Sequence, residues 1–263
     1  MKKRVISAIV ALIIIIPLLI IGGTIFYIAA GILGVIGYNE ILHARETKRK
    51  LPILMKFIGS LSFILIILSS LSELSILQID LKIISIITLL ILLPLSFSNK
   101  KNYNIEDAFY LLASTIFLGI SFGLLISIRN MNLSYILYIA VITIMSDTFA
   151  HFWGTKIGKH KLCPHVSPNK TIEGAIGGTI MGTLLGTIFY TSVFDYTSVF
   201  TVIIISFVLS IIGQCGDLIF SAIKRNYEIK DFGNIMPGHG GILDRLDSIL
   251  TASIAFIILM NLL

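Results

Sequence analysis

Charged residues are scarce in this sequence. Asp, Glu, Lys and Arg make up only 13% of its 263 residues, whereas 56% are hydrophobic. An ordinary soluble domain carries about 25% charged residues, so this composition excludes a water-soluble globular protein. Long apolar runs account for the difference, and they predict an all-α polytopic membrane protein.

Cysteine is almost absent as well. Cys163 lies in a polar loop and Cys215 in an apolar run, a spacing that indicates neither a disulfide framework nor a zinc site. The net charge is +6, but the basic residues stand in short clusters between apolar runs, where they set orientation and meet anionic lipid. We therefore expect membrane lipids as partners and no nucleic acid.

Apolar runs long enough to cross a bilayer recur along the whole chain. They predict about nine transmembrane helices, each near the roughly 20 residues that a span needs, over residues 5–21, 24–42, 53–71, 79–97, 105–128, 133–154, 172–194, 199–220 and 246–263. Only Gly22 and Gly23 separate the first two, so a tight hairpin there needs glycine's freedom at positive φ. With no repeat or soluble domain visible, residues 1–263 are predicted to form one membrane domain, with N-terminal helices in 1–130 and catalytic helices and loops in 131–263.

Basic residues alternate between the loops that connect these spans. One side holds Lys2, Lys3, Arg4, Arg45, Lys48, Arg49, Lys50, Lys100, Lys101, Lys156, Lys159, Lys161, Lys170, Lys224, Arg225 and Lys230. Because cytoplasmic loops carry the excess of Lys and Arg, the N-terminus is predicted to be cytoplasmic. The polar loops 155–171 and 224–245 then face the cytoplasm, where soluble nucleotides are available, and the protein is predicted to lie in the cytoplasmic membrane.

Three late spans contain acids that a purely structural membrane helix avoids. An Asp at a span centre costs about 2.5–3.5 kcal/mol on insertion scales. In the eighth span, Asp217 shares one helical face with Ser221 and Lys224. Asp147 lies in the sixth span and Asp247 in the ninth. Carboxylates near loops rich in Lys, Arg and Gly are suited to holding Mg²⁺ against phosphates. The structural alternative for each acid is a buried ion pair, for example Asp244 or Asp247 with Arg245 or Arg225, or a charge at a helix end near the membrane interface.

Two polar loops add candidates for phosphate binding. In PGHGG, residues 237–241, glycines allow successive backbone N–H groups to turn toward an anion. In SPNKTIEG, residues 167–174, Thr171, or Ser167 further upstream, is predicted to cap the following helix, with Glu173 in its first turn. Lys170 then stands just outside a helix N-terminus, where a lysine is well placed to hold a phosphate.

Long motifs in the C-terminal half resemble those of a known family. The run SAIKRNYEIKDFGNIMPGHGGILDRLD, residues 221–247, with GDLIF before it, resembles the signature of the CDP-diacylglycerol synthases, also called phosphatidate cytidylyltransferases. SDTFA, residues 146–150, and HKLCPHVSPNKTIEG, residues 160–174, resemble upstream motifs of that family. His151 stands where we expect tyrosine, and Met236 where a branched apolar or aromatic residue is more usual. The N-terminal half agrees with the family only in hydropathy.

The resemblance implies nucleotidyl transfer, in which a phosphate oxygen of phosphatidate attacks the α-phosphorus of CTP and pyrophosphate leaves. The resemblance also implies two metal-binding aspartates, Asp217 and Asp244. The expected ion is Mg²⁺, with a possible second cation. The resemblance further suggests a homodimer. The expected catalytic residues are Asp217, Lys224, Arg225, His239, Asp244 and Asp247. The expected substrate-binding residues are Asp147, Ser167, Asn169, Lys170, Ser221, Lys230, Gly240, Gly241 and Arg245.

Three other functions share some of these features. A CTP-dependent lipid kinase would transfer the γ-phosphoryl group instead, but the order of KR, HGG and DRLD favours the synthase. A secondary transporter would predict broken helices at matching places in two halves of the chain, and none is visible. A CDP-alcohol phosphotransferase would need a compact cluster of aspartates with Gly and Arg between them, which the sequence lacks.

Overall fold

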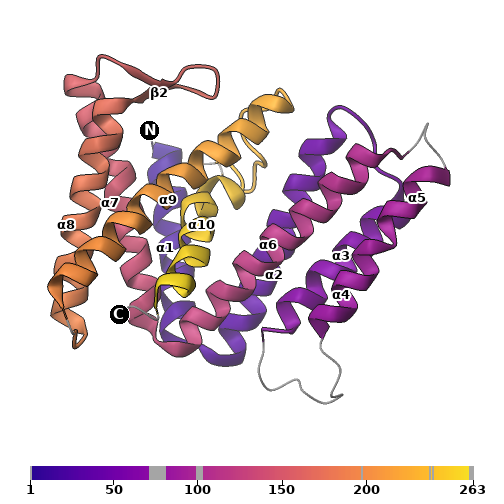
Figure 1. Ribbon diagram of the computed structural model, residues 1–263, viewed down its shortest axis with the longest axis horizontal. Coiled ribbons are helices and arrows are strands. Elements are labelled where there is room, and N and C mark those ends of the chain that lie inside the picture. The colour runs from indigo at the N-terminus through magenta and orange to yellow at the C-terminus, as the bar shows by residue number, and fades with distance from the viewer. Residues whose placement is uncertain are drawn as a thin grey trace. The chain divides into compact units, whose positions relative to one another are not determined.

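The computed structural model describes residues 2–70, 81–98, 103–196, 198–236, 238 and 240–260 (Figure 1). The chain forms two compact units. The first contains Met1–Asn130 with Tyr227–Arg245, and the second contains Met131–Asn226 with Leu246–Leu263. Tyr227–Arg245, which we call the signature loop, therefore belongs to the same unit as the N-terminal half of the chain.

The first unit consists mainly of helices, with the signature loop added to them. Its helices are α1 (Lys2–Ile21), α2 (Gly23–Glu46), α3 (Ile53–Leu68), α4 (Leu81–Leu90), α5 (Leu92–Ser98) and α6 (Ile105–Met131). Within this unit α1 packs on α2, α2 on α3, and α3 on α4. The predicted span over 79–97, whose first two residues lie outside the described part, is divided between α4 and α5. Pro94 explains the break, because its ring clashes with the carbonyl four residues earlier and it has no N–H to donate.

The turn between α1 and α2 confirms the predicted glycine hairpin. Gly22 has φ +65° and Gly23 φ +54°, conformations that other residues rarely adopt. Arg129 covers this turn, donating from Nε to the Leu19 carbonyl at 2.6 Å and from its guanidinium to the Ile20 carbonyl at 3.0 Å. Two carbonyls at the C-terminal end of α1 are thereby satisfied without water.

The second unit combines long helices with a small β-hairpin. It contains α7 (Leu133–Ile157), β1 (Lys161–Cys163), β2 (Ser167–Thr171), α8 (Ile172–Val193), α9 (Val199–Asn226) and most of α10 (Leu243–Leu259). β1 and β2 pair antiparallel, a local exception to the all-α prediction. Thr171 caps α8 as predicted, its Oγ1 accepting from the Gly174 N–H at 3.1 Å.

Five helices of the described chain are long and apolar enough to cross a bilayer, namely α2, α6, α7, α8 and α9. Many large apolar side chains on the helices are exposed, such as Ile20 at 63% and Phe200 at 70%, which suits contact with lipid. The protein is therefore an integral membrane protein. The count of about nine spans stays a prediction.

Glycines at every fourth position bring α8 close to α7, and Figure 1 shows the two helices side by side. Gly174, Gly178, Gly182 and Gly186 are all buried. A Cβ added at Gly178 would lie 2.5 Å from the Ser146 carbonyl oxygen. Small residues with this spacing allow the close backbone approach that holds membrane helices together. This packing fixes the part of α7 that contains Asp147.

Gly178→Ala is expected to destabilise the protein by about 1–3 kcal/mol, because the added methyl group overpacks this interface. Gly31→Ala on α2 is the matched control, since nothing lies within 4 Å of a Cβ added there. The control should be neutral or slightly stabilising. Thermal unfolding in detergent measures both variants, and an equal loss of stability in the two would contradict the packing role of Gly178.

Candidate active site

A polar cavity of about 500 Å³ lies in the second unit, among α7, the β-hairpin, the start of α8 and α9. Its polar lining consists of Asp147, His151, Thr155, Lys161, Asn169, Lys170, Thr171, Gln214 and Asp217. Four of these residues, Asp147, Asn169, Lys170 and Asp217, were predicted as site residues from the sequence. Lys161 was considered only as a topology signal, and His151 had been left without a role.

An ion pair joins two of the predicted residues at this cavity. The Lys170 Nζ lies 2.5 Å from the Asp217 Oδ2, and the two side chains are 24% and 28% exposed. Ser221, one turn along α9, donates to the Asp217 Oδ1 at 3.3 Å. The β-hairpin thus brings a lysine from a polar loop against an acid in a membrane helix, and both side chains remain accessible from the cavity.

Two further carboxylates lie within electrostatic range of Asp217. They belong to Asp147 on α7 and Asp247 on α10, and Lys224 lies in range of Asp247. Ser248 joins these two acids, because its hydroxyl donates to the Asp147 Oδ2 at 3.4 Å and its N–H to the Asp247 Oδ1 at 2.7 Å. Acids from three helices and two lysines therefore gather in this unit.

The donor set of this cluster fits a hard divalent cation. Carboxylate oxygens are the ligands that Mg²⁺ prefers, and the Lys170 ammonium already occupies a cation position on Asp217. In the described part of the chain, no three His, Cys, Asp or Glu side chains form a complete metal site. Magnesium usually takes only one or two carboxylates and completes its shell with water and substrate phosphates.

A buried network of polar side chains orients the face of α9 that carries Asp217. The Gln214 amide donates at 2.9 Å both to the Ser146 hydroxyl on α7 and to the Thr179 hydroxyl on α8. Ser210 donates to the same Ser146 hydroxyl at 3.0 Å. At the other end of α9, the Arg225 Nε donates to the Val166 carbonyl at 3.2 Å and so ties the tip of the β-hairpin to this helix.

The signature loop, in the first unit, folds around Asp244. The Asp244 Oδ2 accepts hydrogen bonds from the N–H groups of Phe232 at 2.8 Å and Gly241 at 2.9 Å. Met236 and Gly240 exchange two backbone hydrogen bonds, and Gly240 takes φ +85°. The N–H groups of Gly240 and Gly241, predicted to face an anion, thus bond to protein acceptors in this structure, and their role in substrate binding stays a prediction.

Glu40 on α2 holds the other side of this loop, and sequence reasoning missed it. Its carboxylate is buried, at 6% exposure, and accepts from the N–H groups of Ile242 at 2.9 Å and Leu243 at 3.0 Å. A Cβ added at Gly233 would lie 2.5 Å from the Glu40 Oε1, so the loop backbone passes close to this side chain. The signal was present, because Glu40 is an acid inside a predicted span.

The beginning of the signature loop is held by the N-terminal half as well. The Thr47 hydroxyl donates to the Tyr227 carbonyl at 3.1 Å, and the Arg45 guanidinium lies 5.8 Å from the Tyr227 ring centre. Burial raises the pKa of Tyr227, so its ring is neutral at physiological pH. Arg45 is itself fixed by hydrogen bonds to the fully buried Asp107 at 2.6 and 2.9 Å.

The predicted site residues fall into both units. The second unit contains Asp147, Ser167, Asn169, Lys170, Asp217, Ser221, Lys224, Arg225 and Asp247, and the first contains Lys230, Gly240, Gly241, Asp244 and Arg245. His239 lies outside the described residues. Lys230 and Arg245 are exposed. Asp217 forms an ion pair with Lys170, but the two side chains are 24% and 28% exposed, so this is not the buried pair of the structural alternative.

Comparison with known proteins extends the resemblance over nearly the whole chain. Residues 2–263 match the model of the cytidylyltransferase family. A protein named phosphatidate cytidylyltransferase from Staphylococcus haemolyticus (strain JCSC1435) is 37% identical over 248 residues, 94% of each chain. One of the same name from Staphylococcus aureus (strain COL) is 37% identical over 249 residues, again 94% of each chain. The similarity thus includes the N-terminal half, for which only the hydropathy had agreed.

Proposed function

Because the chain belongs to the cytidylyltransferase family, we propose that it is a phosphatidate cytidylyltransferase, a membrane enzyme of phospholipid biosynthesis. It transfers the cytidylyl group of CTP to phosphatidate, forming CDP-diacylglycerol and pyrophosphate. The observation that carries this proposal is that Asp147, Asp217 and Lys170 line one polar cavity, with the Asp247 carboxylate within electrostatic range of Asp217.

The reaction needs no nucleophile from the protein. The phosphate of phosphatidate is already an anion, and one of its oxygens forms a bond to the α-phosphorus of CTP while the bond to pyrophosphate breaks. Both substrates and the leaving group are negatively charged. The protein therefore acts by holding them in line and by offsetting their charge, the two contributions that dominate this kind of transfer.

The basic residues of the second unit are the proposed ligands of the nucleotide's phosphates. Lys170, 24% exposed beside the cavity, exchanges the Asp217 carboxylate for a phosphate oxygen when nucleotide enters. Lys161 and Asn169 line the same cavity and add a second cation and an amide donor. Arg225 holds the tip of the β-hairpin and so keeps these side chains in place.

Magnesium is the proposed metal, with Asp217 and Asp244 as its protein ligands and Asp147 and Asp247 supporting them. When bound, the ion would neutralise charge on the phosphates during transfer. The position of the Lys170 ammonium supports the choice of Asp217, because it marks a place where this chain holds a cation. For Asp244 the support is the family signature. The identity of a second cation and the homodimer stay predictions from the resemblance.

The test is an assay of the detergent-solubilised protein with phosphatidate, magnesium and CTP labelled either in the α-phosphate or in the γ-phosphate. We expect label in the extracted lipid only from the α-labelled nucleotide, and none after chelation of the metal. Label from the γ-phosphate would instead identify a lipid kinase. No labelled lipid from either nucleotide would contradict both activities.

We also propose nine spans with a cytoplasmic N-terminus, which places both polar loops on the cytoplasmic face. The support is the split of Lys and Arg between alternate loops. In a variant whose Cys163 and Cys215 are replaced by Ser, single cysteines introduced near Lys48, Lys161 and Asn234 should resist a membrane-impermeant thiol reagent added to intact cells and should react after permeabilisation. A cysteine near Asp195 is the control that should react from outside. Labelling of the Lys161 and Asn234 sites in intact cells would overturn this orientation.

A further inference from the structure

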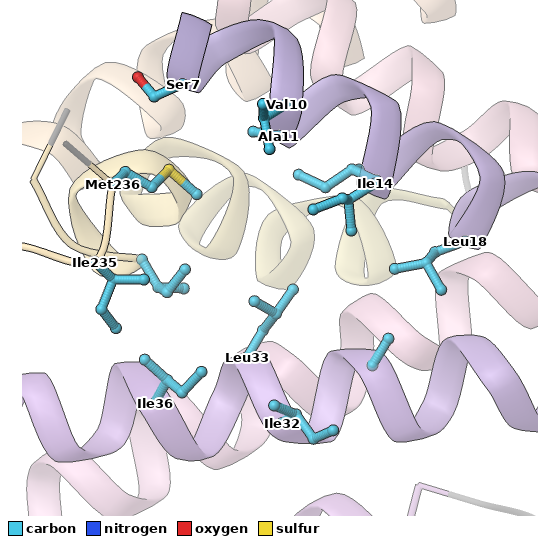
Figure 2. A pocket seen from close by; sticks show the side chains of 13 residues that line it. Ser7, Val10, Ala11, Ile14, Leu18, Ile32, Leu33, Ile36, Ile235 and Met236 are labelled. Carbon is cyan, nitrogen blue, oxygen red and sulfur yellow. The ribbon is translucent and has the colours of Figure 1, made fainter. Parts of the chain in front are cut away.

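A second, apolar cavity of about 680 Å³ lies within the first unit, between α1, α2 and the signature loop (Figure 2). In Figure 2, Ile14 and Leu18 of α1 face Leu33 of α2 across this space, and Met236 of the signature loop lies at one end. Ser7 is the single polar residue among those that line it. The volume falls within the range of about 300–1,000 Å³ that is typical of small-molecule sites.

The cavity has the length of one bilayer leaflet. Its wall on α1 runs from Ser7 to Leu18, which is about 16 Å at 1.5 Å per residue. The hydrocarbon core of a bilayer is about 30 Å thick, so half of it is about 15 Å. An extended hydrocarbon chain that enters from one membrane surface therefore matches both the length and the apolar lining of this space.

One end of the cavity is built by the signature loop itself. Ile235, Met236 and Ile242 contribute to the lining. Met236 is hydrogen-bonded to Gly240 through the backbone, and Ile242 stands two residues before Asp244. A ligand in the cavity thus contacts the same short segment that contains a proposed metal ligand.

We propose that this cavity holds an acyl chain of the phosphatidate substrate while the lipid phosphate lies at the signature loop. The inference rests on the proposed function, because it identifies the occupant as part of that substrate. The cavity then makes the reaction sensitive to acyl-chain length. It also gives α1 a role in substrate recognition, because Val10, Ile14 and Leu18 supply one of its walls.

The experiment fills the cavity and compares two substrates of different chain length. Ala11→Phe places a large side chain in the lining, and Ala113→Phe on the exposed face of α6 is the matched control. The readout is kcat/KM for dioleoyl and for dihexanoyl phosphatidate. We expect Ala11→Phe to lower kcat/KM at least tenfold for the dioleoyl lipid and less than twofold for the dihexanoyl lipid, whereas the control changes neither.

Ala11→Leu, with a smaller added volume, should give an intermediate ratio and serves if the Phe variant does not fold. An unchanged ratio of the two kcat/KM values in both Ala11 variants would overturn the proposal and leave the cavity to bulk membrane lipid. Equal losses of kcat/KM for both substrates would overturn the proposal too, because they would show that the substitution disturbs α1 in general and not the binding of a long acyl chain. If the unmodified protein transferred no cytidine to either lipid, the proposed function itself would fail, an outcome separate from these.

Discussion

Asp217→Asn is expected to lower cytidine transfer by about a thousandfold, the upper end of what removing one charge-stabilising group costs an enzyme. The substitution removes a negative charge and changes the volume very little. In the proposed mechanism, Asp217 holds the cation that offsets the charge of the phosphates, and the neutral asparagine of the variant holds it poorly. The protein should remain folded and inserted, because an intramembrane charge is costly and its removal relieves part of that cost.

The ion pair with Lys170 is the structural alternative, and its exposure decides how much it contributes. Breaking a fully buried pair costs about 3–5 kcal/mol, because the remaining charge has no partner. Lys170 is 24% exposed and lines a polar cavity, so water can solvate it in the variant. The loss of stability should therefore be closer to the 0–1 kcal/mol that is typical of solvent-exposed pairs.

Activity and thermal unfolding, measured side by side across a magnesium titration, separate the two roles of Asp217. Asp195→Asn, at an exposed acid outside the cavity, is the matched control and should keep full activity. The double variant with Lys170→Met removes both partners, and it should stay folded but inactive. Retained activity in Asp217→Asn, or a loss that follows unfolding alone, would refute the metal-ligand assignment.

The structure also explains why Asp217 is a cleaner test than Asp244. The Asp244 carboxylate accepts two backbone hydrogen bonds that fold the signature loop. Asp244→Asn is still expected to abolish transfer. Because an amide group there would disturb those hydrogen bonds, a loss of activity could arise from the loop as well as from the metal. Asp217 accepts only side-chain contacts among those described, from Lys170 and Ser221.

The helices were predictable because the bilayer imposes a simple rule. A span must be apolar over roughly 20 residues, so composition alone marks its ends. The glycine hairpin at Gly22 and the cap at Thr171 followed from local backbone chemistry and are confirmed. Two local signals were overlooked, namely Pro94, which divides the fourth predicted span, and the glycines at every fourth position in α8.

The candidate site was predictable only in part, because its acids are local signals whereas their partners are distant in sequence. Asp217 was recognised as an acid within a span, but its pairing with Lys170 depends on a β-hairpin in a short polar loop without a regular hydrophobic pattern. Likewise, Glu40 and Leu243 are 203 residues apart. Nothing in the residues around Glu40 indicates which backbone groups it binds, since that contact arises from the packing of the first unit.

Glu40→Gln is expected to reduce cytidine transfer by about 10- to 100-fold, as the loss of a group that positions a metal ligand typically does. The Glu40 carboxylate accepts two N–H groups, whereas a glutamine amide has one acceptor oxygen and turns its NH₂ group toward the second N–H. An unsatisfied buried donor costs about 1–3 kcal/mol, so the start of α10 and the adjacent Asp244 should lose their fixed position.

Glu46→Gln on the same helix is the matched control for Glu40→Gln. The Glu46 carboxylate, 21% exposed, pairs with Lys56 at 2.8 Å, and a pair of this kind contributes about 1 kcal/mol at most. The decisive measurement is the magnesium concentration that gives half-maximal activity, together with the thermal unfolding temperature. If Glu40 positions Asp244, its substitution should raise that concentration severalfold in the protein that remains folded. A purely structural role would lower the folded fraction but leave the magnesium dependence unchanged, and that result would exclude Glu40 as a positioning residue.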